Sequence, residues 1–145
     1  MKATFLMCLV PVLLAGCTAT RAVGLASSTP VSENNRGYAF SQYQVAAEDT
    51  ATIVIVRDKG LVGWLSKMYF YINDEFVAKI GAGESVTLYM KPGDYQLSMS
   101  GGLNPSAEHA IEKQVLTALP GETYHYRVSV GIPTGFELKN AAVTR

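Results

Sequence analysis

The sequence predicts an all-β protein, a small antiparallel β-sandwich, and three observations carry this prediction. Segments rich in β-branched and aromatic residues recur roughly every ten residues. Turn sequences containing Gly or Pro separate them, and several of the segments alternate hydrophobic with polar residues, which is the period of a strand with one buried face. We expect the sandwich to span residues 48–145, preceded by a signal peptide at residues 1–16 and a flexible tether at residues 17–47.

The first predicted strand is the uninterrupted β-branched run at residues 52–56 (TIVIV). A continuous apolar run of this kind is typical of a strand that is covered on both faces. Residues 68–73 (MYFYIN) and 76–80 (FVAKI) follow, and the polar residues Asn73, Asp74 and Glu75 between them predict a compact hairpin.

Residues 85–100 show the clearest alternation, in two arms around the sequence Lys91-Pro92-Gly93-Asp94. Pro92 presets φ at the second turn position and Gly93 accepts positive φ at the third, so we expect a type II turn there. Strict alternation on both arms predicts one buried face on each. From this pattern and its counterparts elsewhere we predict eight core residues: Val54, Val56, Val86, Leu88, Leu97, Met99, Tyr126 and Val128.

Residues 107–119 fit both a helix and a strand, because Ile111, Val115 and Leu119 share one side of either. We favour the strand, since the turn sequence Pro120-Gly121-Glu122 follows and leads into the alternating residues 124–130. A last short strand is expected at residues 136–138.

The N-terminus has the organisation of a secretory signal peptide. Lys2 supplies a positive charge and residues 5–14 form an apolar run, too short to span a bilayer as a helix. The run ends in Leu14-Ala15-Gly16-Cys17, which resembles the lipobox of bacterial lipoproteins. That resemblance implies cleavage between Gly16 and Cys17 and attachment of fatty acyl chains such as palmitate to Cys17. Residue 18 is Thr rather than Asp, which in such lipoproteins points to the outer membrane, most simply its periplasmic face.

Composition narrows the partners that we expect. Cys8 would leave with the signal peptide, so the mature chain would contain Cys17 alone and no internal disulfide. Without Lys2 the chain carries one more acidic than basic side chain, which provides no basic surface for nucleic acid. The predicted partners are therefore the membrane, through the lipid on Cys17, and a protein of the cell envelope.

The order of three motifs resembles the DUF2846 domain of bacterial lipoproteins. These motifs are an apolar strand ending in Arg57, the sequence Lys91-Pro92-Gly93-Asp94-Tyr95, and the sequence Pro120-Gly121-Glu122-Thr123-Tyr124. The resemblance covers residues 48–132 and implies a sandwich similar to transthyretin or to the regulatory domain of carboxypeptidases. That family has no established activity, so the resemblance implies no functional residues.

No arrangement of residues in the sequence predicts catalysis, a metal site or a cofactor. Nucleophilic catalysis needs a base, commonly His, and the mature chain has only His109 and His125. Two histidines without a free cysteine make a poor zinc site. The remaining candidates are aromatic residues at predicted outward positions, which are enriched at interfaces and can also stack on sugars: Trp64, Tyr69, Tyr71 and Tyr89.

These observations favour a lipid-anchored binding or assembly module of the cell envelope that has no catalytic activity. The alternative is a small periplasmic hydrolase or carbohydrate-active enzyme that uses His109 or His125.

Overall fold

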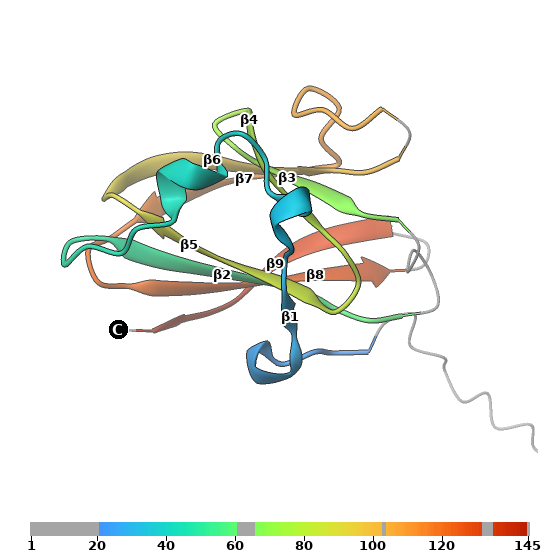
Figure 1. The fold of residues 1–145 in the computed structure, drawn as a ribbon, viewed down its shortest axis with the longest axis horizontal. Helices are drawn as coiled ribbons and strands as arrows, with labels where there is room; N and C mark the ends of the chain where they lie inside the picture. Colours follow the sequence, from blue (N-terminus) through green and yellow to red (C-terminus); the bar gives the residue numbers. More distant parts are fainter. Residues whose placement is uncertain (1–20, 61–65, 103, 132–134, 145) are drawn as a thin grey trace, which may run out of the picture.

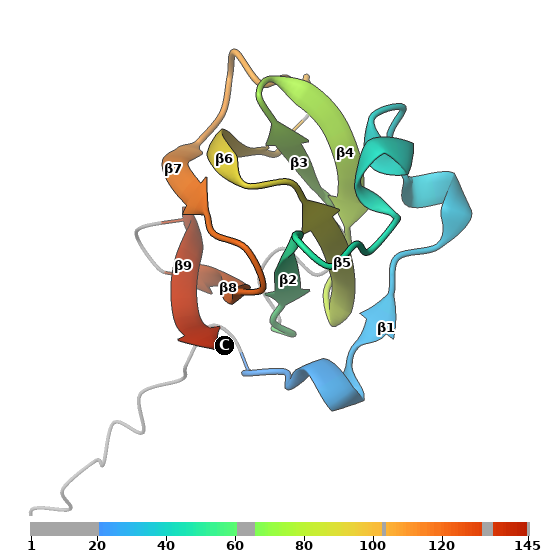
Figure 2. The same cartoon turned by 90° about the vertical axis from the view of Figure 1, so that its left-hand side faces the viewer.

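The computed structural model describes residues 21–60, 66–102, 104–131 and 135–144, which form two facing β-sheets. Figure 1 shows the two layers edge-on, and Figure 2 shows them after a quarter turn. The five-stranded sheet has the order β1-β5-β2-β8-β9 and the four-stranded sheet the order β4-β3-β6-β7. The elements are η1 (Leu25–Ser27), β1 (Thr29–Pro30), η2 (Glu33–Asn35), η3 (Phe40–Tyr43), β2 (Ala51–Arg57), β3 (Met68–Ile72), β4 (Glu75–Ile80), β5 (Glu84–Met90), β6 (Gly93–Ser100), β7 (Glu112–Ala118), β8 (Thr123–Gly131) and β9 (Gly135–Thr144). The predicted all-β sandwich is confirmed.

The hydrophobic core lies between the two sheets, and all eight predicted core residues are buried. Ile53 and Ile55 point from β2 into the core. Val54 and Val56 are buried on the opposite face of β2, where residues 22–25 line a hollow with them. The expectation that this strand is covered on both faces is therefore confirmed.

Strand pairing is largely but not wholly antiparallel. β2 pairs antiparallel with β5 on one side and parallel with β8 on the other. The short β1 also runs parallel to β5. Alternation identifies the buried face of a strand but carries no information on the direction of its neighbour, so the sequence did not reveal these parallel pairs.

The predicted hairpin between β3 and β4 is confirmed, whereas the predicted type II turn at residues 91–94 is wrong. Asn73 and Asp74 both have positive φ, 50° and 64°, as a two-residue hairpin turn requires. Gly93 instead has a φ of 152° and begins β6. β5 and β6 follow each other in sequence but belong to different sheets, because each buries its apolar face against the other layer.

Residues 107–119 contain a strand, as we favoured, but its buried face is the other one. Leu116 and Ala118 of β7 are buried, whereas Ile111, Val115 and Leu119 are exposed, Val115 by 75%. The register with β6 places Leu116 opposite Tyr95, whose ring packs against the core. The last strand is also longer than expected, because β9 extends to Thr144 along β8.

The predicted flexible tether at residues 17–47 is the largest correction. Its described part, residues 21–47, runs beside β5 and on to β4 along one edge of the sandwich (Figure 2). Phe40 is only 7% exposed and belongs to the core, together with Val31 and Tyr43. Gly37 lies so close to β4 that a Cβ atom there would meet the Phe76 carbonyl oxygen at 2.2 Å.

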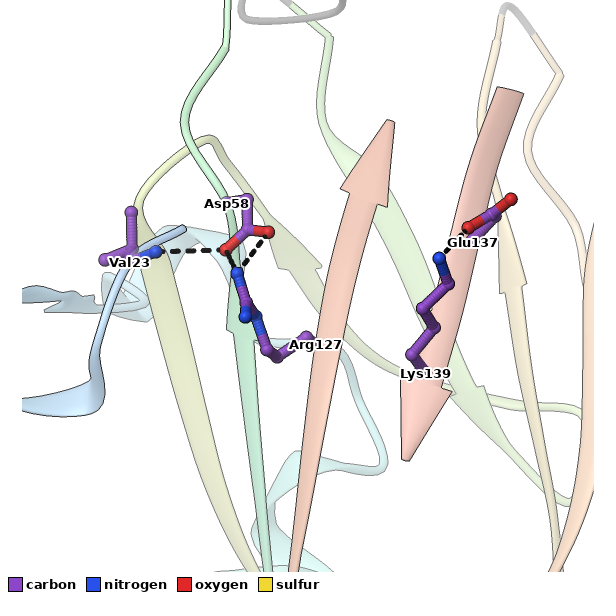
Figure 3. Close-up of polar contacts among 5 residues, drawn as sticks. All are labelled: Val23, Asp58, Arg127, Glu137 and Lys139. Atoms are coloured by element: carbon purple, nitrogen blue, oxygen red, sulfur yellow. Dashed lines mark hydrogen bonds and ion pairs between the residues drawn. The ribbon is translucent and has the colours of Figure 1, made fainter. Parts of the chain in front are cut away.

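The carboxylate of Asp58, just after β2, contacts both β8 and the beginning of this segment (Figure 3). The buried Asp58 carboxylate accepts two hydrogen bonds from Nη2 of Arg127, at 2.8 and 2.7 Å. Asp58 Oδ1 also accepts the backbone N–H of Val23 at 3.0 Å. Next to this contact, the backbone N–H of Arg21 donates to the Lys59 carbonyl, and the backbone N–H of Lys59 donates to the Arg21 carbonyl. Figure 3 also shows the Glu137–Lys139 ion pair on β9.

Candidate functional site

The aromatic residues that we predicted as a binding surface do not form one surface. Trp64, like the lipidation site Cys17 and its neighbour Gly16, lies outside the described residues. Tyr69 and Tyr71 lie on β3, on the outer face of the four-stranded sheet. Tyr89 lies on β5 in the other sheet.

Around Tyr69 and Tyr71 the rings pack mainly on one another. The ring of Phe76 has its centroid 5.7 Å from each of these tyrosines and 6.4 Å from Tyr38. Lys79 Nζ lies 5.3 Å from the Tyr69 ring centroid, a cation–π contact. Tyr71 is only 5% exposed, so it contributes to packing rather than to an accessible binding surface. Tyr38, which is 72% exposed, is the accessible ring of this group.

Tyr89 instead lines a solvent-open pocket of about 700 Å³ at the end of the sandwich where β2 begins. This volume lies within the roughly 300–1,000 Å³ that is usual for small-molecule sites. We call it the tyrosine pocket, and its lining residues are Gln42, Tyr43, Val45, Ala47, Thr50, Asn73, Glu75, Tyr89, Lys91 and Tyr95.

Four parts of the chain build the tyrosine pocket, and the first is β5, which supplies Tyr89. The η3 turn and the residues after it supply Tyr43, and the β3–β4 hairpin supplies Asn73 and Glu75. The connection from β5 to β6 supplies Lys91 and Tyr95. Tyr43, Tyr89 and Tyr95 lie in η3, β5 and β6, so regular backbone structure positions the three rings.

Local hydrogen bonds position the polar groups of the pocket. The Tyr95 hydroxyl donates to the Lys91 carbonyl at 2.9 Å, which fixes the bend between the two sheets. The Asn73 backbone N–H donates to the Gln96 carbonyl at 2.8 Å, and Asn73 Oδ1 accepts the Gln96 backbone N–H at 2.9 Å. Gln42 Nε2 donates to Glu75 Oε2 at 3.2 Å, joining η3 to the hairpin.

The pocket contains one acidic and one basic side chain. Within the described part of the chain, neither Glu75 nor Lys91 forms an ion pair. Burial raises the pKa of the Tyr43 phenol, and the nearby charge of Glu75 and the Tyr95 hydroxyl raise it further. Tyr43 is therefore a neutral hydrogen-bonding group at ordinary pH, in a site whose two formal charges balance.

The sequence predicts Tyr89 as a binding residue, but it does not predict Tyr43, Glu75, Lys91 or Tyr95 as such. Tyr43 was assigned to the tether, although its spacing from Phe40 places both on one side of a helical turn. The sequence predicts Lys91 in a type II turn, which the structure does not contain. Only the pairing of β5 and β6 with different sheets brings these segments together at one end.

The motifs that resemble DUF2846 have structural roles in this chain. The Arg57 guanidinium is buried, and its Nη1 donates to the carbonyls of Ser66 and Ile80 at 2.7 and 2.8 Å. The Tyr124 hydroxyl donates to the Thr117 carbonyl at 2.9 Å and accepts the Leu119 backbone N–H at 3.1 Å. Both residues thus hold strands of the two sheets together.

The two histidines lie in different places. His125 is on the outer face of β8, where it lines a hollow with residues 22–25. His109 lies in the loop between β6 and β7, and its Nδ1 is 2.7 Å from Ser106 Oγ. Ser106 Oγ also accepts the His109 backbone N–H at 3.2 Å, so this contact closes an exposed local turn. Among the described residues, no three His, Cys, Asp or Glu side chains gather as a metal site would require.

No family model matches the sequence, and no curated protein matches it. In the described residues, no helix has the length and apolar character needed to cross a membrane. The resemblance to DUF2846 and to bacterial lipoproteins therefore stays a prediction from the residues themselves.

Proposed function

We propose that this chain is a lipid-anchored binding module of the cell envelope, with no catalytic machinery of its own. The observation that supports the proposal best is that the start of the described chain and the tyrosine pocket lie at opposite ends of β2. The described chain begins beside Lys59, just after β2, whereas the tyrosine pocket includes Thr50, just before β2.

The predicted anchor is close to the first of these ends. Arg21 is held to Lys59 by backbone hydrogen bonds, and Val23 is held by Asp58. Cys17 precedes Arg21 by four residues, which span at most about 14 Å when fully extended. A lipid on Cys17 would therefore keep this end of the sandwich near the membrane.

The tyrosine pocket would then face away from the membrane. The seven residues of β2 separate the two ends by roughly 20 Å at about 3.3 Å per residue. Two or more acyl chains hold a protein firmly on a bilayer. Tethering also raises the effective concentration of the domain for partners at the same membrane, so weak contacts suffice for assembly. An outer-membrane location with the domain on the periplasmic side fits this arrangement.

The alternative, an envelope hydrolase, has one observation in its favour: the contact between Ser106 and His109. A nucleophile–base pair also needs a group that orients the base. Here Ser106 contacts Nδ1 of His109, and the two residues are three positions apart in the same exposed turn. Within the described residues, neither histidine hydrogen-bonds to a carboxylate. The binding module is therefore the better supported reading.

The anchor is tested by labelling cells with palmitate and separating inner and outer membranes. We expect the wild-type chain to be labelled and to sediment with the outer membrane, and Cys17→Ala to lose both properties. Cys8→Ala is the matched control, because that cysteine lies in the predicted signal peptide and should be dispensable. Labelling and membrane association of Cys17→Ala equal to wild type would overturn the anchor.

Crosslinking in intact cells tests the module against the enzyme. We expect the chain to capture a defined envelope component, and we expect His109→Ala/His125→Ala to capture it equally well. A loss of cellular function in this double variant, with its fold and capture intact, would favour the hydrolase.

A further inference from the structure

We infer that the tyrosine pocket is a saccharide-binding site. This inference rests on the proposed function, which it deepens by naming the class of ligand. Three features of the pocket support it: the rings that line it, hydrogen-bonding groups that have capacity to spare, and the balance of charge.

The pocket brings three aromatic rings together at one opening: those of Tyr43, Tyr89 and Tyr95. Sugar rings carry C–H groups on their faces and hydroxyls around their edges. A tyrosine matches both features, because its ring is apolar and its hydroxyl is a polar handle. Tyr43 is largely buried while Tyr89 and Tyr95 are half-buried, so the rings are fixed in place yet reachable from solvent.

Several polar groups of the pocket retain hydrogen-bonding capacity. Within the described residues the hydroxyls of Tyr43 and Tyr89 have no hydrogen-bond partner. Glu75 accepts one hydrogen bond, from Gln42, and can accept more. The Asn73 side chain uses its oxygen on the backbone of β6, which leaves its NH₂ group available to donate.

This mixture of donors and acceptors matches hydroxyl groups, which both donate and accept. Lys91 adds donors without an acceptor, and Glu75 adds acceptors without a donor. A phosphate or carboxylate ligand would meet the Glu75 charge, and a cationic ligand would meet the charge of Lys91. The balanced charges therefore favour an uncharged, polyhydroxylated ligand over an ionic one, and the many polar groups disfavour an apolar one.

The site is tested by isothermal titration calorimetry on the full lipidated chain in detergent micelles. The probes are chitotetraose and maltotetraose, two neutral oligosaccharides that differ in linkage and in N-acetyl groups. We expect at least one to bind with a Kd of about 1 mM or tighter. Tyr89→Ala and Glu75→Gln should each weaken that binding about tenfold or more.

Tyr38→Ala is the matched control, since Tyr38 is an exposed tyrosine outside the pocket. It should leave saccharide binding unchanged. Thermal unfolding verifies that each variant is folded, and Glu75→Gln keeps the side-chain volume if Tyr89→Ala does not fold. The inference is overturned if neither probe binds the wild-type chain at about 10 mM, ten times the expected Kd. It is also overturned if binding survives unchanged in both pocket variants.

The outcome is independent of the anchor. Cys17→Ala in the same micelles should bind saccharide as the wild type does, because the pocket lies at the opposite end of β2. A chain that is not lipidated but binds sugar would refute the anchor alone. A chain that is lipidated but binds no sugar would refute this inference alone.

Discussion

Replacing Phe40 with Ala tests whether residues 21–47 are part of the folded domain. Phe40 lies in η3, is 7% exposed, and packs in the core with Val31 and Tyr43. Its ring also lies 4.9 Å from the Arg36 guanidinium carbon. If the segment were a flexible tether, truncating this ring would not affect the stability of the sandwich.

The expected loss follows from the burial of the ring. Buried Phe→Ala substitutions cost about 3–5 kcal/mol, from lost transfer free energy and the cavity that remains. Phe40 lies at the edge of the sandwich, where η3 can partly collapse into the space, so we expect about 3 kcal/mol. For a domain of this size about 1 kcal/mol changes Tm by roughly 4 °C, which gives a decrease in Tm of about 12 °C.

The assay is thermal unfolding of the full chain in detergent micelles, followed by far-UV circular dichroism. Val45→Ala is the matched control, because Val45 follows η3 in the same segment but is 77% exposed. It should change the free energy of unfolding by less than about 0.5 kcal/mol. A Tm for Phe40→Ala within a degree or two of that for Val45→Ala would show that this segment does not stabilise the sandwich.

Three further substitutions test other contacts. Gly37→Ala should cost about 1–3 kcal/mol and increase hydrogen exchange in residues 36–43, because its Cβ would overlap the backbone of Phe76. Asp58→Asn should cost about 1–2 kcal/mol in urea unfolding, a moderate value because the Arg127 side chain is partly exposed. Burial raises the pKa of Tyr43 above 10.0, so folding stability should decline as pH rises above about 10, and Tyr43→Phe should reduce that decline.

Alternation within strands predicted the architecture because it reports burial directly. The arms on either side of Lys91 identified two strands and their buried faces, and the continuous run at residues 52–56 identified a strand buried on both faces. Which strands become neighbours depends on contacts between distant residues. For that reason the separation of β5 and β6 into two sheets, and the parallel pairing of β2 with β8, were not predicted.

Segments without alternation were the least predictable. Residues 21–47 show no regular spacing of apolar residues, and a segment without such periodicity is typical of a tether or loop. The segment nevertheless contributes a few well-placed side chains, such as Phe40 and Tyr43, and pairs briefly with β5 through β1. The tyrosine pocket includes residues of this segment. For that reason its lining could not be predicted from the sequence, except for Tyr89.

In the function that we propose, the chain is anchored beside the end of β2 and presents the tyrosine pocket away from the membrane. Energy transfer from a single fluorophore on the domain to an acceptor in the lipid headgroups tests it most directly. The lipidated chain would be reconstituted in vesicles with Ala22→Cys or Val45→Cys as the labelling site, both exposed and near opposite ends of β2. We expect strong transfer from position 22 and much weaker transfer from position 45, because roughly 20 Å of strand separates the two ends. Equal transfer from the two positions, or stronger transfer from position 45, would contradict the account.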